Sequence, residues 1–130
     1  MTIEERAERA VQLRSERKCN CCQAAAVVLA DQTSLTEQQL WDLCAGFAGG
    51  MGNMESVCGS LCGVVMVAGA KIRQRSAVGQ ARLIQEEFVR TCGGLLCKDL
   101  KGRDTGTVLC PCEQCVCNAV LAYGKIMGLE

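Results

Sequence analysis

Twelve cysteines and no histidine constrain this chain more than any other feature. Eleven of the cysteines fall into four groups along the sequence: Cys19, Cys21 and Cys22; Cys58 and Cys62; Cys92 and Cys97; Cys110, Cys112, Cys115 and Cys117. Only Cys44 stands apart. Cysteines that serve as small buried hydrophobes would be scattered, so the grouping favours a metal or redox centre. The lack of histidine excludes His-ligated zinc, His-dependent catalysis and haem attachment through C-x-x-C-H.

The composition indicates one domain, residues 1–130, which is long enough to form a hydrophobic core. Disulfide frameworks are typical of secreted domains too small for a core, so we expect reduced cysteines. The 14 basic and 14 acidic residues balance, which removes the electrostatic argument for nucleic acid or an anionic membrane. The longest apolar run, Leu61–Ala70, is far shorter than the ~20 residues of a membrane span. The N-terminus has no signal-peptide core, and we expect a cytoplasmic protein that binds neither nucleic acid nor membrane.

Helical signals recur along the whole chain, whereas no strand pattern, internal repeat or linker is present. Capping boxes are predicted at 2–5, 20–23 and 34–37, each followed by apolar residues at helical spacing. A polar stretch at 98–107 is predicted to be a mobile loop. The expected fold is therefore an all-α, single-domain bundle of about five or six helices.

Several cysteines are expected at the N-termini of these helices. A loop with five glycines between Gly46 and Gly59 leads to Ser56, a suitable N-cap, which puts Cys58 in the first turn. Asn20 precedes Cys21 in the same way, and a proline precedes Cys112. Unpaired N–H groups and the helix dipole favour a thiolate at such positions.

Motif spacing supports a thiolate metal or redox site but does not specify the cluster. The bacterial ferredoxin run is absent, and Cys112-x-x-Cys115 alone is a weak signal. A thioredoxin-like motif would need a βαβ context, which is missing. A redox protein with an iron–sulfur cluster is the first hypothesis. Zinc or Cu(I) binding for storage and thiol–disulfide exchange are the alternatives.

The cysteine segments resemble the C_GCAxxG_C_C family of small redox-active proteins, a domain also found in split-Soret cytochromes. The resembling stretches are 20–25 (NCCQAA), 46–52 (GFAGGMG) and 58–63 (CGSLCG), followed by the segments around Cys97 and Cys112. The resemblance covers about residues 19–125. It implies an all-helical fold, a redox role through an iron–sulfur cluster, and four cluster-binding cysteines: Cys21, Cys58, Cys97 and Cys112.

The chain departs from this pattern by its additional cysteines. Those grouped near the family positions are further candidate metal ligands: Cys22, Cys62, Cys115, Cys19, Cys92, Cys110 and Cys117. They predict a second cluster or one of higher nuclearity, and Cys110 or Cys115 stays open as the C-terminal ligand in place of Cys112. We expect Cys62 to share a face with Cys58, Cys115 with Cys112, and Cys92 to approach Cys97. A redox partner protein is expected, and a homodimer stays open.

Overall fold

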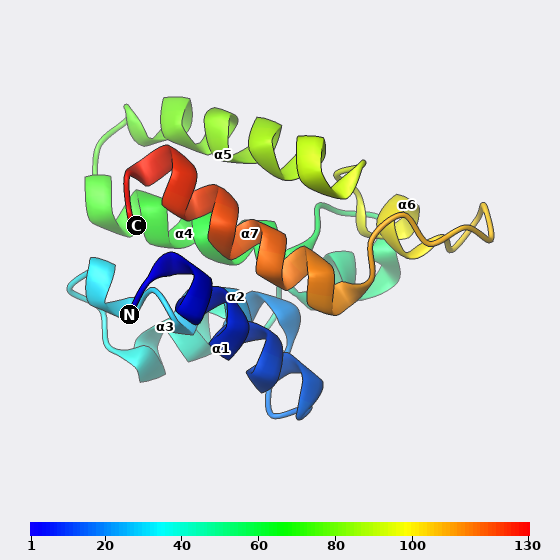
Figure 1. Cartoon of the computed structure of the whole chain (residues 1–130), viewed down its shortest axis with the longest axis horizontal. Coiled ribbons are helices and arrows are strands. Elements are labelled where there is room, and N and C mark those ends of the chain that lie inside the picture. Colours follow the sequence, from blue (N-terminus) through cyan, green and yellow to red (C-terminus); the bar gives the residue numbers. More distant parts are fainter.

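The computed structural model describes residues 1–130 and contains no β-strand, which confirms the all-α fold class. The elements, shown in Figure 1, are α1 (Ile3–Ser15), α2 (Cys21–Val27), a short 3-10 turn (Ala30–Gln32), α3 (Glu37–Cys44), an irregular helical turn (Gly50–Met54), α4 (Gly59–Ile72), α5 (Ala77–Cys92), α6 (Cys97–Lys101) and α7 (Cys112–Met127). The expectation of about five or six helices was too low, because seven α-helices form. The additional one is α6, and four of its five residues lie in the stretch expected to be a loop.

Two of the predicted capping boxes are present, and the third is displaced. The box at the start of α1 forms as expected. At the start of α2, the Gln23 backbone N–H donates to Asn20 Oδ1 at 2.8 Å, and the Asn20 N–H donates to Gln23 Oε1 at 3.0 Å. The start of α3 is capped by Thr36 with Gln39, two residues beyond the predicted Ser34. These reciprocal bonds satisfy N–H groups that a helix leaves unpaired at its start.

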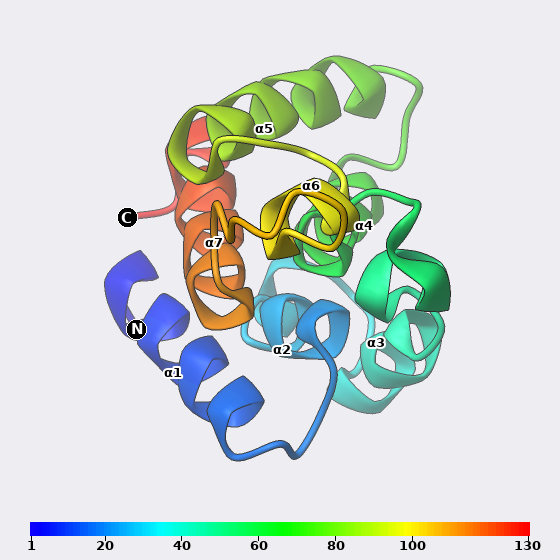
Figure 2. The same ribbon diagram turned by 90° about the vertical axis from the view of Figure 1, so that its right-hand side faces the viewer.

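Helix α7 runs through the middle of the bundle and contacts α1, α2, α4 and α5 (Figures 1 and 2). Its buried stripe includes Val116, Val120 and Tyr123, all fully buried. Phe88 of α5 and Leu29 after α2 are likewise fully buried in the same hydrophobic core. Because aromatic residues are few, most of this core consists of aliphatic side chains and cysteines.

Helix α2 packs closely on α4 at a glycine. A Cβ atom on Gly63 would lie 2.6 Å from the Cys22 carbonyl oxygen, closer than Cβ contacts in proteins allow. All six residues from Cys21 to Ala26 are buried, as expected for a helix that is apolar on every side. The two helices can approach this closely only because position 63 has no side chain.

The start of α7 and the whole of α6 lie at one end of the bundle, and this end faces the viewer in Figure 2. The start of α4 lies here too, because Val57 forms an isolated antiparallel bridge with Leu96. Most of the grouped cysteines belong to the segments that meet at this end.

Candidate metal centre

The starts of α4 and α6 are joined by backbone hydrogen bonds. The Cys58 N–H donates to Leu95 O at 3.1 Å, and the Cys97 N–H donates to Ser56 O at 3.0 Å. These bonds flank the Val57–Leu96 bridge and place the two cysteines at neighbouring helix starts. Cys58 is the N-cap of α4, so the helix starts two residues later than the predicted Ser56 cap would have it, whereas Cys97 is the first residue of α6.

The glycine-rich loop covers this pair of helix starts. Gly49, Gly50 and Gly52 all have positive φ. At Gly50 the space is also restricted, since a Cβ atom would lie 2.7 Å from Cys97 Cβ and 2.9 Å from Ser56 O. Glycine at position 50 therefore meets two requirements at once, a left-handed conformation and close contact with α6.

Cys21 is brought to the same place from α2. The Asn20 side-chain amide donates to Ala45 O at 3.1 Å, which ties the start of α2 to the end of α3. On the other side, a Cβ on Gly59 would lie 2.8 Å from Cys21 Sγ. Glycine at the first position of α4 thus leaves the room that the Cys21 thiol occupies.

Cys112 arrives from α7. It is the first residue of this helix, and Pro111 is the N-cap. The preceding segment is held by Leu100 O, which accepts from both the Leu109 and the Cys110 N–H. The Cys112 thiol lies close to the Cys21 thiol and to the Arg14 guanidinium of α1.

Together these four thiols line one cavity of about 310 Å³, here called the cysteine cavity. Its remaining lining residues come from α1, α2, α4, α6 and the glycine-rich loop: Arg14, Asn20, Ala48, Gly49, Met54, Gly59 and Lys101. The cavity thus brings together Cys21, Cys58, Cys97 and Cys112, which are separated by up to 91 positions, from 21 to 112. None of the other eight cysteines lines it.

Both charged residues of the cysteine cavity are cations, and they favour anionic sulfur. Contact with Cys21, followed by the Arg14 guanidinium, lowers the pKa of Cys112 to about 6. Burial opposes charge on Lys101, yet the nearby thiols of Cys115, Cys58 and Cys112 outweigh burial and raise the pKa of the ammonium. Arg14 Nε is buried without a hydrogen-bond partner. An anion bound among these thiols would be electrostatically compensated.

The sequence did not single out either cation as a site residue. Lys101 follows Cys97 by four positions and so lies on the same face of α6. Its place beside Cys97 could have been predicted had residues 97–101 been expected to form a helix. Arg14 precedes the cysteine groups and carried no signal, because its position depends on how α1 packs against α7.

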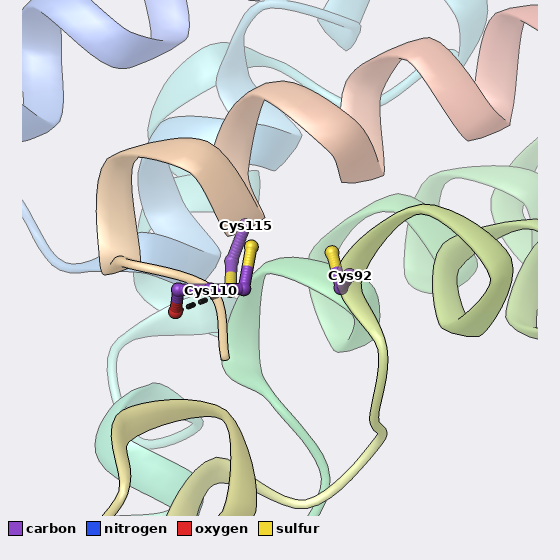
Figure 3. A group of neighbouring side chains, drawn as sticks. All are labelled: Cys92, Cys110 and Cys115. Carbon is purple, nitrogen blue, oxygen red and sulfur yellow. Dashed lines mark hydrogen bonds between the residues drawn. The ribbon is translucent and has the colours of Figure 1, made fainter. Parts of the chain in front are cut away.

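A second sulfur group is formed by three other cysteines (Figure 3). The Sγ atoms of Cys92, Cys110 and Cys115 lie within 4.8 Å of one another, and all three residues are buried. We call this group the cysteine triad. Cys115 therefore does not join Cys112, and Cys92 meets Cys110 at the end of α5 instead of lining the cavity with Cys97.

The remaining cysteines take other positions. Cys22 and Cys44 are fully buried and in thiol–thiol contact, with Cys62 near enough to raise the pKa of Cys22 further. Cys19 and Cys117 are half-buried and belong neither to the cysteine cavity nor to the cysteine triad. The structure thus separates the grouped candidates into a cavity, a triad, a core group and two outlying thiols.

The structure contains no helix long and apolar enough to cross a membrane. In comparisons with known proteins, the family model described as "Putative redox-active protein (C_GCAxxG_C_C)" matches residues 19–126. No curated protein and no solved structure matches the chain.

Proposed function

This chain belongs to the C_GCAxxG_C_C family of redox-active proteins, and from this premise we propose that it carries an iron–sulfur cluster in the cysteine cavity. The proposed ligands are Cys21, Cys58, Cys97 and Cys112. The observation that supports the proposal is that these four thiols, delivered by four separate segments, line one cavity. Four cysteine thiolates are the usual ligand set of two-iron and four-iron clusters.

The cavity is large enough for this group. A four-iron cube with edges of about 2.3 Å and a van der Waals shell of about 1.8 Å occupies roughly 200 Å³. The cavity measures about 310 Å³. A two-iron cluster is smaller and fits as well, so iron analysis is needed to distinguish the two.

The helix starts suit an anionic cluster. Cys21, Cys97 and Cys112 are the first residues of their helices, and Cys58 caps a fourth. The N-terminal ends of the longer helices, α4 and α7, carry partial positive charge and backbone N–H groups that stabilise negative charge. With four thiolates an iron–sulfur cluster is negatively charged, so the dipoles and the two cations of the cavity act in the same direction.

When bound, the cluster would supply a site that accepts and donates one electron at a time. The chain's own contribution is to hold the four thiols, to exclude most water, and to offset charge. Cys21, Cys58 and Cys97 are only 6%, 2% and 4% exposed, so solvent has little access to these three sulfur atoms, whereas Cys112 is half-buried. Burial makes a reduced, more negative cluster harder to form, whereas Arg14 and Lys101 make it easier.

The proposal is tested on anaerobically purified protein. We expect broad visible absorption near 400 nm, a region typical of sulfur-to-iron charge transfer, and equal amounts of iron and acid-labile sulfide. Cys97→Ser should lose most of the iron and the absorption. Cys117→Ser is the matched control, since Cys117 does not line the cavity, and should keep both.

Iron-free protein that stays iron-free after anaerobic reconstitution would contradict the proposal. Zinc or Cu(I) in place of iron would instead favour thiolate metal storage. Equal loss of iron in Cys97→Ser and Cys117→Ser would show that the cluster lies elsewhere.

We further propose that the protein acts in the cytoplasm as an electron carrier for a partner protein. The buried thiols support the role as an electron carrier, because a cofactor enclosed on most sides exchanges electrons more readily than it reacts with small substrates. Reduction of the visible chromophore by a purified reductase, with rates that saturate as its concentration rises, would be the expected behaviour.

A further inference from the structure

We propose that the cysteine triad, Cys92, Cys110 and Cys115, is a second metal site that holds one thiophilic divalent cation. This site is separate from the cysteine cavity and does not depend on the iron–sulfur proposal. It rests on the position, burial and hydrogen-bond partners of the three thiols.

The geometry needs only a small adjustment to bind an ion. The three Sγ atoms lie within 4.8 Å of one another. An ion about 2.3 Å from each sulfur would place the sulfurs about 3.8 Å apart in a tetrahedral arrangement and about 4.0 Å apart in a trigonal one. A contraction of about 1 Å at most, well within the reach of side-chain rotation, therefore brings all three into coordination.

The three thiols come from different parts of the chain and lie near one another (Figure 3). Cys92 is the last residue of α5, Cys110 precedes α7, and Cys115 lies in its first turn. Their exposed fractions are 3%, 3% and 0%. Burial limits the access of oxidants to these thiols, so they are available as reduced ligands.

Neighbouring donors already point at the sulfur atoms. Lys101 Nζ donates to Cys115 Sγ at 3.2 Å, and Asn118 Nδ2 donates to Cys92 Sγ at 3.4 Å. Asn118 is oriented by Gln114, whose amide donates to Asn118 Oδ1 at 2.7 Å. Hydrogen bonds to ligand sulfur stabilise the thiolate form, and residues that hydrogen-bond to the metal ligands in this way are typical of protein metal sites.

The charge balance selects the class of ion. Three thiolates carry three negative charges, and the Lys101 ammonium offsets one of them. A divalent cation brings the total to zero, whereas a monovalent cation leaves one negative charge buried, which is costly. The soft sulfur donors exclude magnesium and calcium and favour an ion such as zinc.

The triad borders the cavity but is distinct from it. None of its three cysteines lines the cavity. Two residues link them: Lys101, which lines the cavity and donates to Cys115 Sγ, and Cys58, whose thiol lies close to that of Cys115. Variants of Cys92 and Cys110 therefore test the triad without removing a proposed cluster ligand.

The test uses the full-length protein with its iron retained and Co²⁺ as the probe ion. We expect one Co²⁺ per chain, with visible d–d bands and near-ultraviolet thiolate-to-cobalt absorption, and displacement by Zn²⁺. Cys92→Ser and Cys110→Ser should each weaken cobalt binding by more than about 100-fold, beyond the range typical of outer-shell changes. The matched control Cys117→Ser, on the same helix as Cys115, should bind as the wild type does.

Unchanged cobalt binding in Cys92→Ser and Cys110→Ser would overturn the proposal, as would a disulfide within the triad of the anaerobically purified protein. Loss of iron from these two variants would also overturn it, because the triad would then belong to an iron cluster. Should the variants fail to fold, zinc-edge X-ray absorption on the zinc-loaded wild type decides: at least three sulfur neighbours support the site, and fewer overturn it. Cys97→Ser should lose iron but keep the cobalt site, which separates this test from that of the proposed function.

Discussion

The contact between α2 and α4 gives a quantitative prediction. Gly63 lies in the interior of α4, directly against the backbone of Cys22. In Gly63→Ala, the new Cβ would lie 2.6 Å from the Cys22 carbonyl oxygen, and ordinary contact begins at 3.4 Å. The two helices would have to separate by about 0.8 Å. The obstacle is backbone rather than a flexible side chain, so it cannot rotate away.

The expected cost follows from two opposing effects. Alanine gains about 1 kcal/mol over glycine in a helix interior. Overpacking a close contact costs about 1–3 kcal/mol. Gly69→Ala is the matched control in the same helix, because a Cβ at position 69 has no atom within 4 Å. Gly69→Ala should therefore gain about 1 kcal/mol, and Gly63→Ala should fall about 1–3 kcal/mol below it.

The assay is urea and thermal unfolding followed by helical circular dichroism on anaerobic protein. For a chain of this size, 1 kcal/mol corresponds to about 4 °C in Tm, so the two variants should differ by about 4–12 °C. The dependence of the unfolding free energy on urea should stay the same in both, since neither change alters the surface exposed. Equal midpoints for Gly63→Ala and Gly69→Ala would refute the close approach of α2 and α4.

Three other perturbations have expected outcomes. Asp31 forms a bidentate ion pair with buried Arg6, and this pair lowers the pKa of the Asp31 carboxyl in the folded protein. The pair therefore stabilises the fold fully above the pKa that Asp31 has in the unfolded chain. This stability is lost as the pH falls through the lower pKa of the folded protein. Asp31→Asn should thus cost about 1 kcal/mol at pH 7, with a smaller loss below pH ~4, measured by urea unfolding against pH. Lys101→Met should lower the midpoint potential of a bound cluster by on the order of 50 mV in a redox titration, which is the one-electron equivalent of about 1 kcal/mol. Lys98→Met is the control: it removes a salt bridge with Glu55 and should leave the midpoint potential nearly unchanged. Removal of the cluster should speed proteolysis at loop 46–54 first, because metal binding stabilises the folded state; equal digestion of both forms would contradict this.

Much of the fold was predictable because its signals are local. The capping box of Asn20 and Gln23 involves residues three apart, so the start of α2 follows from the sequence alone. Helix α6 was not predictable, since its five residues are too few for a periodic pattern. It forms where Cys97 N–H bonds to Ser56 O, a contact between segments about 40 positions apart, from 56 to 97.

The partners of individual cysteines were harder to predict than the helices. Cys112 and Cys115 are three residues apart and were expected to share a face, yet Cys112 adjoins Cys21, and Cys115 belongs to the cysteine triad with Cys92 and Cys110. The reason is the central position of α7, which is packed by other helices on several sides. A difference of three positions along this helix therefore brings a thiol against a different neighbour.

The sequence by itself determined that the chain is all-helical and that its cysteines are grouped, because periodicity, caps and composition are properties of short segments. Only the tertiary structure decided which thiols meet. Whether Cys58 lies beside Cys97 depends on a single backbone bridge, and whether Cys21 joins them depends on the absence of a side chain at Gly59. Distances between thiols on different helices are determined by the packing of those helices, and that packing depends on contacts between residues far apart in the chain.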